Sequence, residues 1–256
     1  MHVVAKVLIR RDPVWRWYFA RELEVYDCLP DAVSAPAIHS RSSAEHVLVL
    51  ARAPGAALGP GRRTVRDIDD RAVLGILELL RELANWQACS RLPTSAPPGV
   101  IAEMRRRLLE DPTSPRAWFL DGIARCAARG ILTGTQANAM RAALLAYPRL
   151  APCHGDLLPR NLIVDGHRPT LIDWECAGLH LRDWDRALLW VGLPIAQQER
   201  VETDIASDRD PQRRAAFFAL IAFAFARELQ FSRRGSRLKR AQLHAELSHA
   251  VARLWR

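Results

Sequence analysis

The hydrophobic pattern of the first fifty residues predicts a small region that combines strands with one helix. The apolar run Val3–Ile9, which only Lys6 interrupts, is typical of a strand. Helical spacing of apolar residues follows over 12–29, and Pro30 ends it. Two more strands are indicated by short apolar segments near 36–41 and 46–51.

The remainder of the chain has mostly helical periodicity. After a Gly/Pro-rich connector at 54–63, Thr64 and Asp67 resemble a capping box that would start a long helix ending near Gln87. Further helices are expected over 100–110, 115–129, 134–147 and most of 183–256. We therefore expect an α+β protein with a small domain at 1–52 and a larger, mainly helical domain at 53–256.

Composition limits the class of protein. The 256 residues suffice for a real core in one domain or two closely packed lobes. The longest apolar run, Ala215–Ala226, is too short to span a bilayer, and no signal peptide pattern is seen. Five widely spaced cysteines without a Cys-x-x-Cys motif are typical of reduced, packed thiols. These observations predict a cytoplasmic protein without membrane contact.

The net charge of +9 could indicate an anionic partner. The densest basic cluster, Arg233–Arg240, is better explained as a solvated loop, since nearly all the basic residues of this chain are arginines. No segment has the pattern of a groove-reading helix or of stacked aromatic residues that bind RNA. Nucleic-acid binding is therefore not expected.

A hairpin at 151–173 carries the most informative polar residues. Apolar segments at 162–164 and 169–172 flank an Asp165-Gly166 turn, so the residues before and after them return to the same end. Asn161 stands at one such position and Asp173 at the other, which is the arrangement that two ligands of one metal ion require.

Asp156 precedes Asn161 by five residues, in the sequence His154-Gly155-Asp156. An aspartate there could accept the proton of a substrate hydroxyl, and Mg²⁺ bound nearby could hold a nucleotide. Each residue alone could be a turn or cap residue, but the matched spacing of all of them favours a phosphoryl-transfer site.

This region resembles the aminoglycoside phosphotransferase / choline kinase family. The matching sequences are His154-Gly155-Asp156-Leu157 with Asn161, and Ile172-Asp173-Trp174-Glu175. The resemblance implies a two-lobed protein-kinase-like fold with a small, truncated N-lobe that contains strands and a mainly helical C-lobe. It also implies that Asp156 is the catalytic base and that Asn161 and Asp173 bind Mg²⁺, with ATP as the phosphate donor.

The resemblance extends to residues outside the hairpin. Lys6 is one of only two lysines in the chain, and a lysine on this strand would contact the nucleotide phosphates. Its partner would be Glu22, with Glu24 as the second choice; the alternative is an edge-strand lysine without a role. The backbone of Arg52 and Ala53 would contact adenine. Asp185 would support the catalytic loop, or alternatively would only favour the start of its own helix.

Two features bear on catalysis and substrate. The hairpin that covers the phosphates in relatives is absent ahead of Lys6, since no glycine precedes Gly55. Three explanations remain open. The true start of the protein could lie upstream of Met1, the N-lobe could bind phosphate without this hairpin, or the protein could be non-catalytic. An acidic group could bind a cationic aminoglycoside, although a solvated helix start and loop is the favoured reading of it; its members are Glu199, Glu202, Asp204, Asp208 and Asp210.

The resemblance and the residues together predict an ATP- and Mg²⁺-dependent phosphotransferase. Its acceptor would be a hydroxyl group of a small molecule, such as an aminoglycoside-like antibiotic, an amino alcohol, a sugar or a related metabolite. The alternative is a non-catalytic kinase-like protein that binds a nucleotide or a partner.

Overall fold

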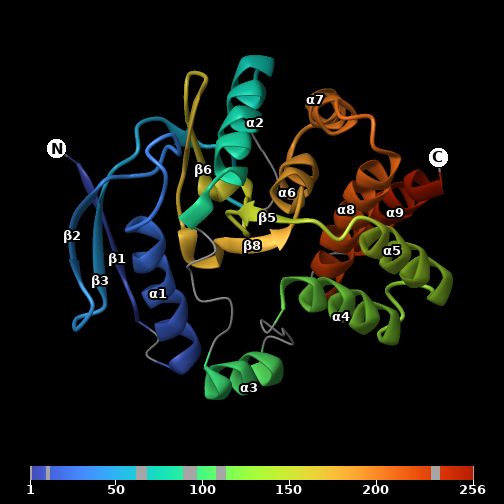
Figure 1. Ribbon diagram of the computed structural model, residues 1–256, viewed down its shortest axis with the longest axis horizontal. Helices are drawn as coiled ribbons and strands as arrows, with labels where there is room; N and C mark the ends of the chain where they lie inside the picture. The colour runs from blue at the N-terminus through green and yellow to red at the C-terminus, as the bar shows by residue number, and fades with distance from the viewer. Residues whose placement is uncertain are drawn as a thin grey trace.

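The structure is a computed structural model that describes residues 2–9, 12–61, 68–88, 97–107, 114–231 and 237–255. Figure 1 shows strands β1, β2 and β3 beside helix α1 at the left, strands β5, β6 and β8 in the middle, and helices α4, α5, α8 and α9 at the right. The first part contains β1 (Val3–Val7), α1 (Pro13–Tyr26), β2 (Ile38–Ser42), β3 (Val47–Ala51) and β4 (Ala56–Ala57). Four helices follow: α2 (Asp70–Ala84), α3 (Pro98–Arg107), α4 (Pro115–Ala128) and α5 (Gly134–Ala146).

The hairpin region is built from short elements. They are β5 (Leu150–Cys153), η2 (Pro159–Asn161), β6 (Leu162–Asp165), β7 (Arg168–Leu171), η3 (Trp174–Cys176) and β8 (Gly178–Leu181). The chain ends with α6 (Trp184–Gly192), α7 (Ile195–Ala206), α8 (Pro211–Phe231), α9 (Arg237–Ala252) and η4 (Arg253–Trp255). The α+β class and the mainly helical character of the second part are confirmed.

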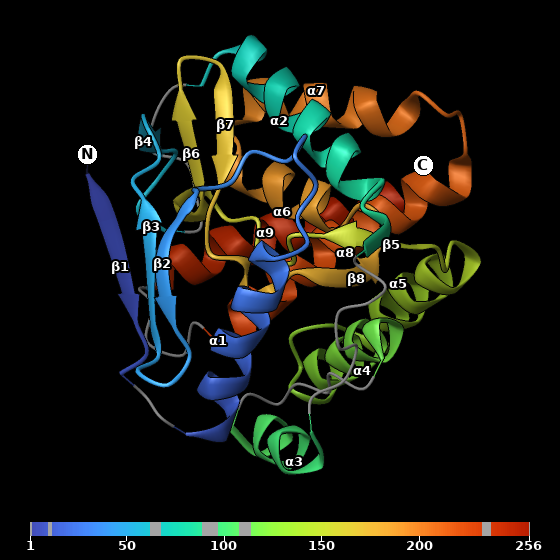
Figure 2. The same cartoon turned by 60° about the vertical axis from the view of Figure 1, so that its left-hand side comes forward.

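An antiparallel sheet with the strand order β1-β3-β2 forms the small N-terminal part (Figure 2). Helix α1 packs on it through Phe19 and Leu23, which contact Leu48 and Leu50 of β3. Strand β1 lies at an edge of the sheet, and its Val4 side chain is 52% exposed. The predicted strands and helix are confirmed, and α1 ends at Tyr26, three residues before its predicted end.

Helix α1 begins where the sequence indicates. The Asp12 side chain accepts hydrogen bonds from the backbone N–H groups of Val14 and Trp15, and Pro13 occupies the first turn. An aspartate cap satisfies donors that would otherwise lack partners, and proline at this position loses no hydrogen bond. These local choices fix the direction of α1, which carries Glu22 toward the hairpin region.

Helix α2 is shorter than predicted. Asp69 is its N-cap and accepts a hydrogen bond from Ala72 N at 2.7 Å, and the helix ends at Ala84 instead of near residue 87. The proposed capping box, Thr64 with Asp67, lies outside the described residues. The helix therefore starts at a later aspartate that caps it equally well.

The β6–β7 hairpin is confirmed, with Ile163 opposite Thr170. Two pairings were not predicted: β4 of the connector pairs with β6, and β5 pairs with β8. These contacts tie the connector and the start of the catalytic loop to the hairpin region. The domain boundary after residue 52 remains a prediction.

Helix α8 forms the centre of the helical part and contacts α4, α5, α6 and α9. Its alanines and phenylalanines over 216–226 are buried, which explains the long apolar run. Among the helices of the described residues, none has both the length and the apolar character needed to cross a membrane.

Candidate active site

The catalytic loop leaves β5 at Cys153 and is held by a buried histidine. His154 Nε2 lies 2.9 Å from the carbonyl oxygen of Ile172, and its ring packs against Trp174 at 4.7 Å between centroids. The imidazole therefore connects the loop that bears Asp156 to the segment that bears Asp173. Its role in this structure is to hold the two segments in register.

Gly155 is required at its position. Its φ is +86°, and a Cβ atom there would lie 2.2 Å from the carbonyl oxygen of Cys176. Any side chain would push the loop away from η3. The glycine thus allows the catalytic loop and the segment after Asp173 to pack closely.

Asp185 of α6 holds the catalytic loop through hydrogen bonds to its backbone. Its carboxylate accepts hydrogen bonds from the backbone N–H groups of His154 and Gly155, at 2.5 and 2.9 Å. Burial raises the pKa of Asp185, while His154 and these hydrogen bonds lower it. The sequence allowed two roles for Asp185, support of the catalytic loop or a favourable charge at the start of its own helix. These hydrogen bonds agree with the first.

Asp156 and Asn161 lie together at the end of the loop. Asn161 Nδ2 lies 2.9 Å from the backbone oxygen of Asp156 and 3.2 Å from its Oδ2. Arg160 Nη2 also reaches Oδ2, at 3.0 Å. Asn161 accepts a backbone hydrogen bond from Ile172, which fixes it next to the strand that leads to Asp173. The hairpin thus brings the loop residues to the Asp173 end.

Asp173 takes a left-handed conformation, with φ of 68°, between β7 and η3. Its Oδ1 lies 2.5 Å from Lys6 Nζ, which also lies 2.5 Å from Glu22 Oε2 and 3.4 Å from Glu175 Oε2. The Lys6–Glu22 pair predicted from sequence is therefore formed, and Glu24 is not the partner seen. The ammonium sits among three carboxylates contributed by α1 and by the segment after β7.

Burial and the neighbouring charges shift the pKa values of the residues in this cluster. Desolvation alone would lower the pKa of Lys6, but attraction by Glu22, Asp173 and Glu175 raises it overall. Desolvation raises the pKa of Glu22, and Lys6 opposes this effect. Desolvation likewise raises the pKa of Glu175 to about 7.

The same three carboxylates form a group that could hold a metal ion, with ligand oxygens within 4.8 Å of one another. Hard oxygen ligands of this kind suit Mg²⁺. Glu175 had been given no role from sequence. Its position two residues after Asp173, within one turn of η3, is the signal that could have identified it.

The connector after β3 contains Arg52 and Ala53. Both line a cavity of about 290 Å³ bounded also by residues before β2 and by the hairpin. The backbone N–H of Arg52 donates a hydrogen bond to the carbonyl of His2 at 3.0 Å, so this donor is already engaged.

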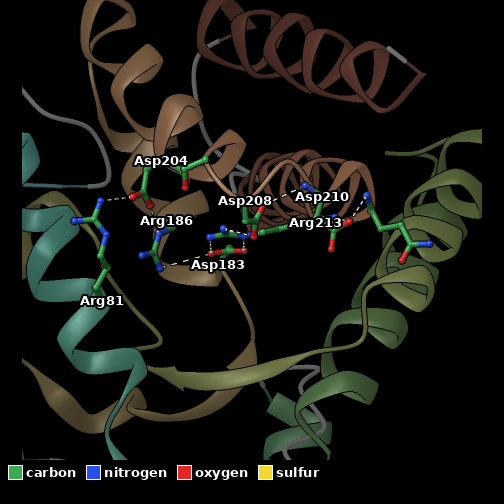
Figure 3. A network of polar contacts seen from close by, with 9 residues as sticks. Arg81, Asp183, Arg186, Asp204, Asp208, Asp210 and Arg213 are labelled. Atoms are coloured by element: carbon green, nitrogen blue, oxygen red, sulfur yellow. Dashed lines mark hydrogen bonds and ion pairs between the residues drawn. The ribbon is translucent and has the colours of Figure 1, made fainter.

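The acidic group at 199–210 is joined to arginines (Figure 3). Asp204 accepts from Arg186 at 2.7 Å and from Arg81 at 2.5 Å. Asp208 accepts from Arg213 at 2.7 Å, and Glu202 pairs with Arg253. Asp210 accepts from the backbone N–H groups of Gln212 and Arg213 at the start of α8. Four of the five carboxylates are therefore engaged by arginines or by backbone N–H groups at the start of α8, whereas Glu199 and Asp208 are exposed, as expected for a solvated helix start and loop.

A buried ion pair lies beside Asp185. Asp183 accepts two hydrogen bonds of 2.8 Å from the guanidinium of Arg213, and Arg186 approaches it at 3.6 Å. Figure 3 shows this pair between α6 and α8. Sequence reasoning missed it because the partners are thirty residues apart on different helices.

The basic cluster at 233–240 falls largely outside the described residues, and α9 begins at Arg237. Of the five cysteines, those at 28, 126, 153 and 176 are described, and all four are free thiols. Burial raises the pKa of Cys153. These thiols fit the packing role expected of them.

Comparison with known proteins adds a family and a fold. The model of the phosphotransferase enzyme family matches residues 9–228. No match to the chain was found among curated proteins. The solved structures with the same fold include a choline/ethanolamine kinase family protein from Mesorhizobium loti, 19% identical, with a TM-score of 0.59; the alignment covers 98% of this chain and 86% of that one.

Two other solved structures are similar to the same extent. A thermostable mutant of aminoglycoside phosphotransferase APH(4)-Ia is 17% identical, with a TM-score of 0.61 over 98% of this chain and 86% of that one. Macrolide 2'-phosphotransferase MphH from Brachybacterium faecium is 16% identical, with a TM-score of 0.59 over 96% and 83%. One APH(4)-Ia structure is a ternary complex with ADP and hygromycin B. The kinase-like fold expected from the sequence is confirmed.

Proposed function

Because the chain belongs to the phosphotransferase enzyme family, we propose that it transfers the γ-phosphoryl group of ATP to a hydroxyl group of a small molecule. The observation that carries this proposal is the convergence of two groups of residues. Asp156 and Asn161 are hydrogen-bonded to each other, and Asp173 lies in contact with the Lys6–Glu22 pair. The nucleotide complex of a structural neighbour supports ATP as the donor.

Asp156 is proposed to act as the general base. Arg160 and Asn161 both contact its Oδ2, which orients the carboxylate, and Asp156 borders a cavity that could receive an acceptor. The acceptor oxygen forms a bond to the γ-phosphorus as the bond from phosphorus to the bridging oxygen breaks. The electron pair leaves with ADP, and the hydroxyl proton passes to Asp156 and then to solvent.

Asn161 and Asp173 are proposed to hold Mg²⁺, with Glu175 close enough to join them. Bound there, the ion would neutralise charge on the nucleotide phosphates. The Lys6 ammonium would exchange its contact with Asp173 for one with the phosphates and would keep its contact with Glu22. The backbone carbonyl of Arg52 and the N–H of Ala53 would contact adenine, because the Arg52 N–H already donates to His2. A cytoplasmic location remains part of the proposal.

Titration calorimetry with ATP tests the nucleotide part of this proposal. We expect binding that requires Mg²⁺ and is lost in Asp173→Ala. The matched control is Asp121→Ala, which removes an exposed aspartate from α4, away from the hairpin, and should bind normally.

Transfer is tested separately on a panel of hydroxyl compounds. Asp156→Ala should abolish phosphate transfer while its Mg²⁺–ATP binding and its unfolding midpoint stay close to those of the unaltered protein. Transfer that persists in Asp156→Ala would exclude Asp156 as the base. Nucleotide binding without transfer to any compound would favour the non-catalytic alternative.

A further inference from the structure

A cavity of about 120 Å³ opens beside the proposed base. Asp156 and Glu175 are among the residues that line it. The walls come from helices α1, α3, α4 and α8 and from strand β8, so the cavity lies where the two parts of the molecule meet. An acceptor with its hydroxyl at Asp156 would extend into this space.

Large apolar side chains form much of the wall. Trp17 and Tyr18 of α1 lie edge to face, with 5.0 Å between ring centroids. Trp118 of α4 is held by edge-to-face contacts with Phe119 at 4.6 Å and with Phe223 at 5.4 Å, so its position is fixed. Rigid aromatic walls favour a flat, apolar ligand.

Two guanidinium groups also line the cavity. The guanidinium carbon of Arg21 lies 5.3 Å from the Trp17 ring, and that of Arg227 lies 5.1 Å from the Trp118 ring. Arg21 is further fixed by hydrogen bonds from Nε and Nη2 to the carbonyl of Ala177, at 2.9 and 2.5 Å.

Gly178 allows this placement of Arg21. A Cβ atom at residue 178 would lie 2.3 Å from Arg21 Nη2. The fold therefore makes room for a guanidinium at this wall of the cavity.

The charges along the cavity are unevenly distributed. Among its described lining residues, the carboxylates are Asp156 and Glu175, both at the reacting end, whereas Arg21 and Arg227 carry positive charge. Desolvation lowers the pKa of His180, another lining residue, to about 4, and Arg21 and Arg227 contribute to this shift. His180 is therefore neutral near pH 7; burial is the main cause of its shift, and the two guanidinium groups add to it.

We propose that this cavity binds the acceptor, and that the acceptor is a hydroxy acid: a hydroxyl compound with a flat apolar body and an anionic group. The aromatic side chains would contact the body, and Arg21 and Arg227 would pair with the anion. Guanidinium groups bind carboxylates through parallel hydrogen bonds. This assignment rests on the proposed function, because it takes Asp156 as the reacting end.

Two other acceptor classes fit the cavity less well. A polycation needs several carboxylates, and four of the five at 199–210 are engaged by arginines or by the start of α8; they are Glu202, Asp204, Asp208 and Asp210. A quaternary ammonium needs an open aromatic face, and a guanidinium covers one face of Trp17 and one of Trp118.

Three matched probes test the charge preference. They are 3-phenyllactate, its neutral amide and phenylalaninol, which share a phenyl ring and a hydroxyl and differ in charge. Each is titrated by calorimetry into the full chain saturated with Mg²⁺ and the non-hydrolysable nucleotide AMP-PNP. We expect the acid to bind on the order of 10-fold more tightly than the amide, and phenylalaninol to bind most weakly.

Variants assign the preference to the two arginines. Arg227→Met should reduce affinity for 3-phenyllactate on the order of 10- to 100-fold and leave the amide nearly unchanged. Arg21→Met should do the same, and Arg21→Lys should keep part of the preference. The control for Arg227 is Arg214→Met, since Arg214 also stacks on a phenylalanine of α8 and is exposed. The control for Arg21 is Arg16→Met, which removes an exposed arginine from the same helix, α1.

The nucleotide titration separates the two proposals. Loss of AMP-PNP binding in the unaltered chain would count against the proposed function itself. Normal nucleotide binding together with equal or tighter binding of phenylalaninol, or with no binding of any probe, would overturn the hydroxy-acid assignment. Unchanged discrimination in both methionine variants would overturn it as well.

Discussion

The ammonium of Lys6 lies 2.5 Å from the carboxylate of Asp173, a residue 167 positions further along the chain. Glu22 and Glu175 complete the group, so one cation faces three carboxylates. In this arrangement Lys6 occupies the space among the oxygens that could hold a metal ion. If Asp173 binds a metal ion as proposed, lysine and metal ion would compete for it until nucleotide phosphates gave Lys6 other partners.

Removing the ammonium should expose that competition. Lys6→Met leaves three carboxylates without their cation, so we expect Mn²⁺ to bind without nucleotide on the order of 10-fold more tightly than to the unaltered protein. Phosphate transfer should fall on the order of 100-fold, because a fixed charge near the phosphates is lost. Calorimetry with Mn²⁺ and a transfer assay measure the two effects.

Lys239→Met is the matched control, since Lys239 is the only other lysine and lies on α9, where it pairs with Glu228. It should change neither quantity. Equal Mn²⁺ affinity in Lys6→Met and the unaltered protein would contradict the competition between lysine and metal ion.

Asp185 should be needed both for stability and for turnover. Asp185→Asn replaces one accepting oxygen with an amide NH2 group, a donor that would face the backbone N–H of His154 or Gly155. We expect unfolding to become easier by about 1–3 kcal/mol, the cost of an unsatisfied buried group. The loosened loop should lower kcat more than it raises KM for ATP. Urea titration and steady-state kinetics measure both, with the exposed Asp121→Asn on α4 as control.

The placement of the residues at the centre of the site was predictable because it depends on consecutive residues. Asn161 and Asp173 flank a hairpin whose turn and strands are written in consecutive residues, so their return to one end follows from the sequence. Lys6 stood out because the chain otherwise uses arginine almost throughout.

The parts that were missed depend on contacts between distant segments. From sequence alone, the group at 199–210 looks like an exposed acidic cluster. In the folded protein, Arg81, Arg186 and Arg213 of other helices pair with its members. Likewise, Arg21 and Arg227 become neighbours of one cavity only after α1 and α8 are packed. Local patterns carry no information on such pairings, which tertiary packing decides.

The buried Asp183–Arg213 pair should be costly to break from either side. Arg213→Met leaves a buried carboxylate, and Asp183→Asn removes the charge while keeping a residue type that tolerates the left-handed φ of 72°. Each change is expected to cost about 3–5 kcal/mol of stability, and the double variant should lose less than the sum.

Urea unfolding of the two single variants and the double variant gives the coupling energy. The exposed pair Arg200–Asp70, at 2.5 Å, is the control, and Asp70→Asn should change stability little. Additive losses for Asp183 and Arg213 would mean that their contact contributes nothing specific.

The imidazole of His180 should make stability depend on pH in the acid range. Desolvation lowers its pKa from 6.5 to about 4, and a hydrogen bond to the carbonyl of Cys176 only partly opposes this. Between these two pH values the unfolded chain binds a proton that the folded protein does not. Stability from this group is therefore complete above about pH 6.5 and is lost as pH falls toward 4, by about 3 kcal/mol in total.

His180→Gln isolates this contribution, because glutamine can still donate to Cys176 but does not titrate. Urea unfolding at pH 7, 6, 5 and 4.5 should give parallel behaviour of the variant and the unaltered protein above pH 6.5, and a steeper loss for the unaltered protein below it. The exposed His39→Gln should follow the unaltered protein throughout. Identical slopes for His180→Gln and the unaltered protein would show that the imidazole is protonated as readily in the folded protein as in the unfolded chain, and burial of His180 would then not lower its pKa.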